Sequence, residues 1–507
     1  MMRILSLLLA VPFVALVPLQ SARAQLGEQF LLIGTLEKFT LNVADPGAPL
    51  LKGGTMRVSG HDVVIPRNLL IRFPTRFISP QQVFDEAPAG STRSGLALDD
   101  NGPVPFEVEI TGNIVGTRYI AGLVAISQVS LATGGGYITA IDGAGRMRIG
   151  AVPGAPTPAD ATVQLNDPKG RFGPITTGLD TRFQVDSDNP SVTAETGYPM
   201  CLSVAGSPAY CATVNRSLPG RLLVMGPTGL APSPAGGLPV PPCPACDPTK
   251  MAPLRVGDAI VYTGILHKVS PSQRIITAFS IVANVGIYTR PGTNPAYVRI
   301  EGSLEGTAGS PTPRIPPVAS SPFLPDEVQD RFKVEGFTTD PSRALDIYAI
   351  DVNGTTGKET VRRLFTLEPK EPPRGRFFKV VGKNSGILFG RPSTLRGNTR
   401  ELMIRLGPII PDGTDVATLP DPALMIRGAG DEGVFPGRYI APVDEYIFAE
   451  NKLPGDRLVP NNFECLAFLV NGSGPLDGTG PVVGQLTPWP NTIAAPVLDC
   501  GTRAALP

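Results

Sequence analysis

The chain has 507 residues, of which 17% are charged, and its 44 lysines and arginines equal its 44 aspartates and glutamates. This balance gives no electrostatic attraction for nucleic acid or an anionic lipid surface, so the sequence disfavours both as partners. The 57 glycines and 56 prolines disfavour long helices and separate strands by turns, while a hydrophobic fraction of 42% is enough for packed cores. The composition therefore predicts an all-β protein made of several small β-barrel or sandwich modules.

The chain begins with a pattern typical of a secretory signal peptide. Arg3 gives a positive start, residues 4–17 form an apolar run, and Ala22-Arg23-Ala24 is a small-x-small cleavage site. The apolar run is short for a transmembrane helix, and an uncleaved anchor helix is the alternative. We therefore expect residues 1–24 to be a signal peptide, and the mature chain to be secreted or periplasmic with no membrane span.

All six cysteines follow this segment, and an even number in an exported protein favours disulfide bonds. Proximity in sequence favours the pairs Cys201–Cys211, Cys243–Cys246 and Cys465–Cys500 among the fifteen pairings that six cysteines allow. Cys243 and Cys246 also have the C-x-x-C spacing of a redox dithiol. Prolines surround them, however, and no helix pattern follows to stabilise a thiolate, which favours a structural disulfide.

In chain order, residues 25–216 are predicted to form an N-terminal β domain. Apolar and β-branched residues alternate roughly with polar ones at 30–42, 55–65, 106–128 and 137–149. The last of these runs contains a glycine-rich turn and is predicted to be a hairpin. Five or more strands separated by such turns predict a small barrel or sandwich.

Two proline-rich stretches, 217–253 and 309–325, divide the rest of the chain. Both lack hydrophobic periodicity and are predicted to be semi-rigid connectors. Between them, 254–308 opens with a Gly-Asp turn followed by three strands, which predicts an OB-like module. Residues 326–406 repeat the strand–turn–strand pattern and are predicted to be a further β module. The loop-rich segment 407–507 is expected to pack on the earlier modules.

The candidate ligand-binding residues lie in the densest polar stretch, residues 163–201. Asp167, Arg171 and Arg182 could form a charge cluster across a long loop there and bind a ligand. The alternative is a loop whose ion pairs only order the loop itself.

The same stretch offers a speculative calcium site. Asp186-Ser187-Asp188-Asn189 resembles the start of a calcium loop, but Ser191 and Gly197 stand where an EF-hand requires glycine and glutamate. A looser site could use Asp180, Asp186 and Asp188 as oxygen ligands. The alternative is that these side chains cap turns through the backbone, and the sequence implies no other cofactor.

Nucleophilic catalysis finds little support in the sequence. The only two histidines, His61 and His267, both lie within predicted strands, and no G-x-S-x-G elbow is present. Carboxylates remain available for a hydrolase that needs an acid and a base, although their spacing does not distinguish them from solvated strand faces. They are Asp99, Asp100, Glu107 and Glu109 in the first domain and Asp444, Glu445 and Glu450 in the last segment. A single tryptophan, Trp489, disfavours extensive stacking on sugar rings.

Four segments carry a resemblance to a known group of proteins: 166–173 (NDPKGRFG), 186–190, 198–201 and 446–451. In them the chain resembles an uncharacterised family of large secreted β-rich proteins of bacteria and filamentous fungi. The resemblance implies the same fold class and an exported protein over most of the mature chain. Because the family has no established activity, it implies no catalytic or binding residue.

The sequence thus favours a secreted, non-catalytic binding or structural protein whose partner is an extracellular polymer or a protein. OB-like barrels offer a face and loops suited to such ligands, although this is an argument from fold alone. The alternative is a carboxylate-dependent hydrolase of an extracellular polysaccharide, with catalytic residues unknown. Convergence of acids from distant segments in one cleft is the observation that bears on this choice.

Overall fold

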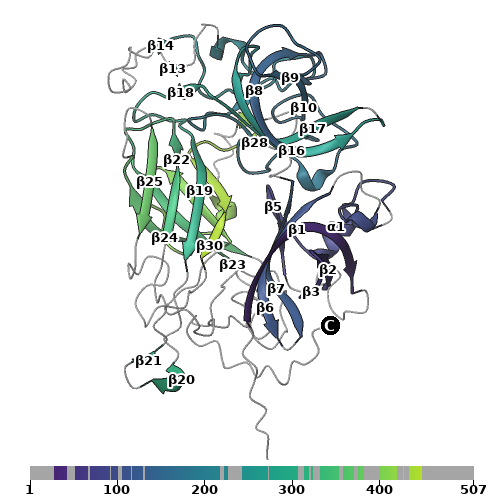
Figure 1. The fold of residues 1–507 in the computed structure, drawn as a ribbon. Coiled ribbons are helices and arrows are strands. Elements are labelled where there is room, and N and C mark those ends of the chain that lie inside the picture. Colours follow the sequence, from purple (N-terminus) through teal and green to yellow (C-terminus); the bar gives the residue numbers. More distant parts are fainter. Residues whose placement is uncertain are drawn as a thin grey trace, which may run out of the picture.

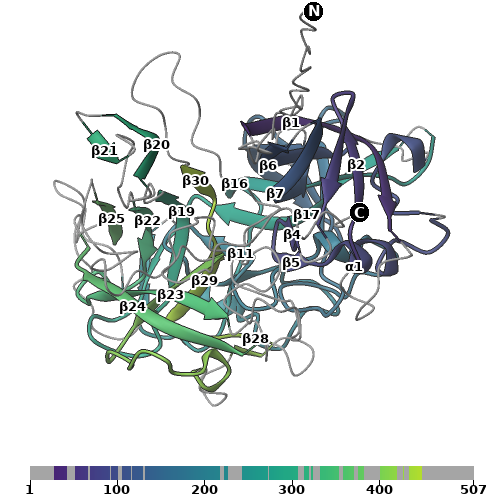
Figure 2. The ribbon, with the colours of Figure 1, turned by 90° about the horizontal axis from the view of Figure 1, so that it is seen from below.

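The computed structural model describes most of the chain between residues 28 and 447. The described ranges are 28–42, 52–66, 69–91, 93–100, 105–115, 117–128, 132–216, 222–225, 242–271, 273–306, 313–318, 321–323, 332–352, 358–369, 375–381, 400–419, 426–427 and 433–447. The protein is all-β, as predicted, and its described residues form two five-stranded barrels and a sandwich. The second barrel lies above, and the first barrel and the sandwich lie side by side beneath it (Figures 1 and 2). None of the described helices is long and apolar enough to cross a membrane.

Barrel 1 closes on itself through one parallel strand pair. Its strands are β1 (Glu28–Leu41), β2 (Gly54–Val58), β3 (His61–Ile65), β6 (Glu107–Val115) and β7 (Arg118–Ser127). β1 pairs with β2 and β6, β2 pairs with β3, and β6 pairs with β7, all antiparallel. The parallel pairing of β3 with β7 completes a Greek-key order like that of an OB-fold. The inward-facing residues of these strands form one hydrophobic core.

Barrel 2 has the same strand order. Its strands are β8 (Thr133–Ile141), β9 (Met147–Gly150), β10 (Ala161–Leu165), β16 (Ala259–Lys268) and β17 (Arg274–Ala283). β8 pairs with β9 and β16, β9 pairs with β10, and β16 pairs with β17. The parallel pairing of β10 with β17 closes the barrel, and β11 (Val192–Ala194) extends the sheet beyond β17.

The two barrels differ in the connection between their third and fourth strands. In barrel 1 this connection holds β4 (Ile71–Phe73), β5 (Arg76–Ile78), α1 (Pro80–Asp85) and η1 (Leu98–Asp100). Helix α1 starts where it does because Ser79 and Gln82 form a capping box around Pro80. In barrel 2 the connection covers 166–258 and holds η2 (Thr181–Phe183), β11, β12 (Met200–Cys201), η3 (Thr213–Arg216), β13 (Leu222–Met225), β14 (Pro242–Cys243) and β15 (Ala252–Pro253). β18 (Gly286–Tyr288) follows barrel 2 and pairs with β13.

The long connection of barrel 2 also docks the two barrels. Phe183 of η2 enters the core of barrel 1, where its ring centroid lies 5.2 Å from that of Phe73 and 5.1 Å from that of Phe106. Ile265 and Phe279 of barrel 2 join the same core. The barrels are therefore held by shared apolar burial.

The C-terminal module is a sandwich of two four-stranded sheets. One sheet has the order β25 (Arg376–Val381), β22 (Phe332–Thr338), β19 (Val298–Gly306), β30 (Glu445–Ile447). The other has the order β24 (Glu359–Leu367), β23 (Leu345–Val352), β26 (Glu401–Leu406), β29 (Arg438–Pro442). Alternate residues of both sheets meet in a core of their own. The remaining elements are β20 (Pro313–Val318), β21 (Ser321–Phe323), η5 (Val416–Thr418), β27 (Ile426–Arg427) and β28 (Gly433–Val434).

The module boundaries differ from those predicted. β16 and β17 were expected to open a separate OB-like module at 254–308, but they supply the fourth and fifth strands of barrel 2, where Ala259 pairs with Tyr137. The predicted domain 25–216 accordingly contains barrel 1 and only the first three strands of barrel 2. The proline-rich stretch 217–253 lies inside a barrel connection, because strands far apart in the chain pair in space.

Two of the three predicted disulfides, Cys201–Cys211 and Cys243–Cys246, are formed, and both lie in the barrel 2 connection. The structure describes no free cysteine in its part of the chain. The third predicted pair, Cys465–Cys500, falls outside the described residues, as does the predicted signal peptide.

Candidate functional site

In the polar stretch 163–201, the predicted site residues use their charged groups for contacts within the protein. Asp167 is fully buried, and its carboxylate accepts backbone N–H groups of Arg171 at 2.9 Å, Phe172 at 2.7 Å and Gly173 at 3.2 Å. Burial raises the pKa of Asp167, although these hydrogen bonds and the charge of Arg171 oppose the rise. The carboxylate therefore shapes the loop around 167–173 and is not open to a ligand.

Arg182 is likewise buried and has a structural role. Its side chain is completely buried, and its guanidinium forms an ion pair with Asp180 at 2.6 Å. It also donates to the carbonyl oxygens of Val83, at 2.7 Å, and Ser94, at 2.6 Å, both in the barrel 1 connection. Arg182 thus joins the two barrels, and Asp180 neutralises it.

The three aspartates of the predicted calcium site serve separate purposes. Asp180 holds Arg182, and Asp186 caps a turn by accepting the backbone N–H groups of Asp188 at 2.7 Å and Asn189 at 3.2 Å. Asp188 forms an ion pair with Arg438 of the sandwich at 3.1 Å. Among the described residues, no three histidine, cysteine, aspartate or glutamate side chains are placed to hold a metal ion together.

This turn also docks barrel 2 on the outer face of the sandwich. The buried Asn189 accepts the backbone N–H of Ile440 at 2.8 Å and donates to the carbonyl oxygen of the same residue. The contact brings acids of both modules together. Burial raises the pKa of Asp186 to about 6, and burial together with the charges of Glu359, Asp188 and Asp186 raises the pKa of Glu401 to about 8.

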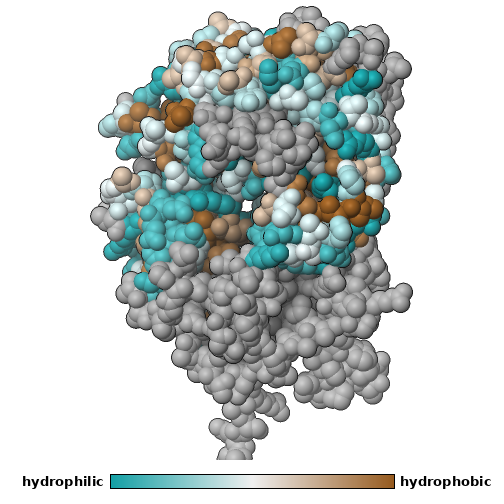
Figure 3. Space-filling view, turned by 180° about the vertical axis from the view of Figure 1, so that it is seen from behind, coloured by the Kyte–Doolittle hydropathy of each residue, from teal (hydrophilic) through white to brown (hydrophobic). Residues whose placement is uncertain are grey.

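A different set of charged residues lines an open cleft between the modules. Two adjoining cavities, of about 90 Å³ and about 360 Å³, share Arg72, Glu109, Ala125 and Asp444 in their walls. They lie between β6 and β7 of barrel 1 and the segment 442–445 of the sandwich. Seen from behind, the molecule is hollowed between two of its parts, and hydrophobic residues gather beside the hollow (Figure 3).

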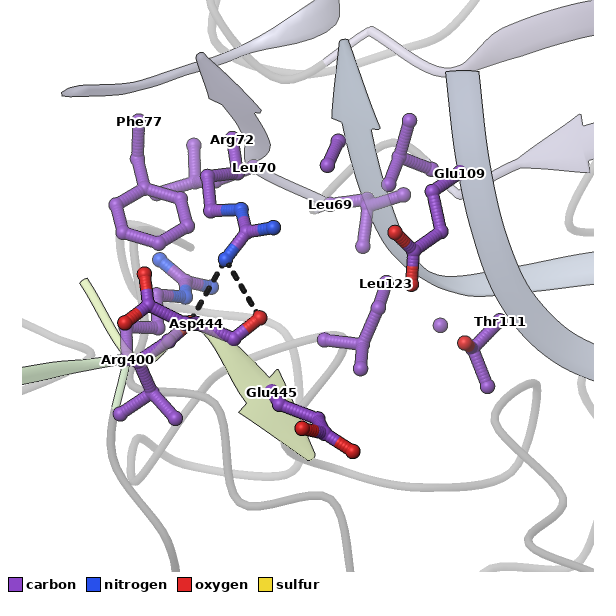
Figure 4. Close-up of a pocket in the computed structure, with 14 residues that line it drawn as sticks. Leu69, Leu70, Arg72, Phe77, Glu109, Thr111, Leu123, Arg400, Asp444 and Glu445 are labelled. Atoms are coloured by element: carbon purple, nitrogen blue, oxygen red, sulfur yellow. Dashed lines mark hydrogen bonds between the residues drawn. The ribbon is translucent and has the colours of Figure 1, made fainter. Parts of the chain in front are cut away.

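Arg72 bridges the two walls of this cleft. It lies on β4, where Ile71 and Phe73 on either side are buried in the barrel core, so alternation turns Arg72 outward. Its Nη1 donates to the carbonyl oxygens of Val443 at 2.8 Å and Asp444 at 3.1 Å (Figure 4). Its Nε and Nη2 have no partner in the described part of the chain and are available to a ligand.

Glu107 and Glu109 face the cleft from β6. They alternate with Val108 and Ile110, which are fully buried in the core of barrel 1. Neither carboxylate forms an ion pair or hydrogen bond with any described residue. Figure 4 shows Glu109 across the smaller cavity from Arg72 and Asp444. Unlike Asp167, these carboxylates keep their full capacity to accept hydrogen bonds.

Asp444 faces them from the sandwich. One of its carboxylate oxygens accepts the backbone N–H of Ser303 at 2.9 Å and lies 3.3 Å from the hydroxyl of the same residue. Burial and the neighbouring Glu445 raise the pKa of Asp444, while Ser303 and Arg72 lower it, and the net shift is upward. The cleft therefore contains one carboxyl group that holds its proton more tightly than usual.

Apolar residues complete the walls. Leu69, Leu70 and Leu123 line the smaller cavity together with Phe77, whose ring centroid lies 5.7 Å below the Arg400 guanidinium. Next to them, two exposed aliphatic residues stand directly opposite the cleft-lining residues of β6. These are Leu31, opposite Thr111, and Ile33, opposite Glu109, each 59% exposed.

Sequence reasoning found part of this site. Glu107, Glu109, Asp444 and Glu445 were among the acids named for a hydrolase, and the structure brings these four together although the two pairs are far apart in the chain. Of the other acids named, Asp100 instead accepts hydrogen bonds from Ser94 and Gly95 within its own loop, Asp99 is exposed away from the cleft, and Glu450 lies outside the described residues.

The two arginines of the cleft were missed. The only signal for Arg72 in the sequence was its position as a charged residue between two apolar ones in 71–73. Arg400 carries no such pattern, because only the pairing of β26 places it beside Phe77.

No protein-family model, no curated protein and no solved structure matches this chain. The resemblance noted from four sequence segments therefore stays a prediction.

Proposed function

We propose that this is an exported binding protein whose inter-module cleft takes an extended, hydroxyl-rich segment of an extracellular polysaccharide. The observation that carries the proposal is the convergence of unpartnered carboxylates from β6 with Arg72 and the segment 442–445 around one elongated cavity. Export is supported by two disulfides, which persist in oxidising compartments.

The chemistry of the walls favours a neutral polyol over an anionic ligand. Carboxylates such as Glu107 and Glu109 accept hydrogen bonds from hydroxyl groups, and the free nitrogens of Arg72 donate to hydroxyl and ring oxygens. Among the described residues, four acids and two arginines line the two cavities, so a nucleic acid or another polyanion would be repelled. Aliphatic side chains such as Leu123 suit the apolar faces of sugar rings.

A second candidate, a glycoside hydrolase, is favoured by one specific feature. Hydrolysis of a glycosidic bond requires a protonated carboxyl group as acid and an ionised one as base or nucleophile. Asp444, with its raised pKa, fits the first role, and Glu109, which has no described partner, fits the second. In that case the same cleft would bind and cleave the polymer.

The test is calorimetric titration of the disulfide-bonded protein with a panel of neutral oligosaccharides, combined with an assay for new reducing ends. We expect at least one neutral oligosaccharide to bind and Glu109→Gln to weaken binding roughly 10-fold or more, because a charged hydrogen-bond acceptor is lost. Asp99→Asn, at an exposed acid outside the cleft, is the matched control and should leave binding unchanged.

The reducing-end assay separates the two candidates. Binding without new reducing ends supports a binding protein, whereas their release, abolished in both Asp444→Asn and Glu109→Gln, supports the hydrolase. Binding that is equal in the wild type and Glu109→Gln would place the ligand elsewhere and overturn both.

A further inference from the structure

A third cavity, separate from the two in the cleft, lies at one end of the sandwich. It has a volume of about 130 Å³, well above the roughly 10–15 Å³ that a single water molecule requires. Three arginines line it, Arg343, Arg405 and Arg438, together with Asn294 and Phe435, and none of the described lining residues is acidic. The three guanidinium groups give this concave site a positive potential, which the charges of Asp188, Asp186 and Glu359 near Arg438 reduce.

Two of these arginines oppose each other in the sheet. Arg405 of β26 and Arg438 of β29 are directly paired across the antiparallel ladder and point to the same face. Like charges in this position destabilise a sheet, unless a counter-charge lies between them. Arg405 is also opposite Asp346 on its other side, but that carboxylate accepts hydrogen bonds from Arg363 at 3.0 Å and Thr366 at 2.6 Å.

The carboxylates next to these arginines do not line the cavity, and they leave some of the guanidinium N–H groups without a described partner. Arg438 is only 8% exposed and pairs with Asp188 at 3.1 Å through Nη2, yet its buried Nε has no partner in the described structure. Asp340 lies 4.0 Å from Arg343, and it already accepts hydrogen bonds from Gly292 and Ser342.

Of the three arginines, Arg405 has the fewest described contacts that could offset its charge. Its one described side-chain hydrogen bond goes from Nη1 to the carbonyl oxygen of Pro408, at 2.9 Å, and no described carboxylate lies within ion-pair distance of it. Its neighbour Arg438 is fixed in orientation, because the guanidinium carbon lies 4.9 Å from the centroid of the Phe435 ring. Such preorganised guanidinium groups bind planar or tetrahedral oxyanions through paired N–H donors.

We propose that the pocket formed by Arg343, Arg405 and Arg438 is an oxyanion-binding site that takes a sulfate, phosphate or carboxylate group. The anion neutralises the opposed pair Arg405–Arg438 and accepts their unused N–H donors. The group can come from a free inorganic anion or from an acidic sugar, and both share the chemistry that the pocket recognises. The site is independent of the neutral-polymer cleft, which lies on the barrel 1 side of the sandwich.

The test is a thermal unfolding series of the disulfide-bonded protein in sodium sulfate, sodium phosphate and sodium glucuronate, at constant ionic strength set with sodium chloride. We expect at least one oxyanion to raise Tm in a saturable manner, because it binds only the folded state. Calorimetry of that anion should show one site, with affinity reduced roughly 10- to 100-fold in Arg405→Gln, which loses a charged hydrogen-bond donor.

A second readout distinguishes a binding role from a structural one. In chloride alone, Arg405→Gln should be at least as stable as the wild type, because the substitution removes like-charge repulsion. Arg274→Gln, at an exposed arginine of β17, is the matched control and should keep the full response to the anion. A larger Tm rise with sulfate or phosphate than with glucuronate identifies a free anion as the source, and the reverse identifies an acidic sugar.

Three outcomes would overturn the proposal. They are equal effects of oxyanions and chloride, an unchanged anion response in Arg405→Gln, or loss of stability of that variant in chloride alone.

Discussion

The connection between β10 and β16 and the cleft beside β6 both gather aspartates, glutamates and arginines, but they use them in opposite ways. In the connection, Asp167 and Arg182 are fully buried, and their two charges are satisfied by nearby backbone or by an ion pair. In the cleft, Glu107 and Glu109 have no described partner and Arg72 uses only one of its nitrogens. Local charge density therefore marks a loop that orders itself, whereas a candidate site arises where charges from distant segments converge.

The two barrels show why this difference exists. Both have the same strand order, and both carry extra structure between the third and fourth strands. The longer connection of barrel 2 forms only short strands of two to four residues, and buried polar side chains and two disulfides also order its backbone. The shorter connection of barrel 1 adds β4 beside β7, which carries Arg72 into the gap next to the sandwich.

The largest expected effect is that of Arg182→Met. The substitution leaves Asp180 as a poorly compensated buried charge and two carbonyl oxygens without a donor, so we expect a loss of about 3–5 kcal/mol in unfolding free energy. Denaturant unfolding measures the change. Arg146→Met, which breaks an exposed ion pair with Asp142, is the matched control and should cost at most about 1 kcal/mol. Equal losses in the two variants would contradict the structural role of Arg182.

Asp167→Asn comes next. The amide retains one oxygen for three backbone N–H groups and turns an N–H₂ group toward them, so we expect a loss of about 1.5–3 kcal/mol. Oligosaccharide binding in the cleft, measured on the folded fraction, should not change. A binding defect without a loss of stability would restore Asp167 as a ligand-binding residue.

The contact between barrel 2 and the sandwich should make stability depend on pH. The pKa of Asp186 is raised to about 6 and that of Glu401 to about 8, whereas unfolded carboxyl groups titrate near pH 4, roughly. Because the folded state holds these protons more tightly, their contribution is complete below about pH 4 and is lost as pH rises through about 6 and then about 8.

Glu401→Gln tests this dependence. The variant should be more stable than the wild type at pH 8 by at least about 1 kcal/mol and should lose the slope between pH 6 and 8. Unfolding curves measured from pH 4 to pH 9 give the comparison. A wild-type protein whose stability increases over this range would refute the assignment.

The smallest expected effect on stability is that of Glu109→Gln, the cleft counterpart of Asp167→Asn. Since the Glu109 carboxylate has no described partner, its replacement should change the unfolding free energy by no more than about 0.5 kcal/mol. The same denaturant series measures it. A loss similar to that of Asp167→Asn would show that Glu109 has a structural role and would remove the contrast between the two regions.

Much of the local structure could be predicted from the sequence. Alternation of apolar residues predicted strands at 55–65 and 106–128, and the abundance of glycine and proline predicted the all-β class. Short sequence separation gave Cys201–Cys211 and Cys243–Cys246, because closing a short loop costs little entropy. These features depend on residues that are near one another in the chain.

The module boundaries and the site depended on long-range pairing. A proline-rich stretch looks the same whether it links two domains or interrupts one barrel, and only the pairing of β16 with β8 distinguishes the two cases. Nothing in the sequence indicates that Glu109 and Asp444 lie close together. They meet because the burial of Val108 turns Glu109 outward and because Arg72 holds the backbone of 443–444 against barrel 1.

The sequence by itself thus determined the β-rich class, two disulfides and the composition that disfavours nucleic acid, since each follows from residue type and short-range spacing. The tertiary structure alone decided which charged groups are bonded within the protein and which remain open to a ligand. The physical reason is that a carboxylate or guanidinium becomes structural when backbone or an opposite charge reaches it. That condition is set by the packing of three modules and not by the residues adjacent in the chain.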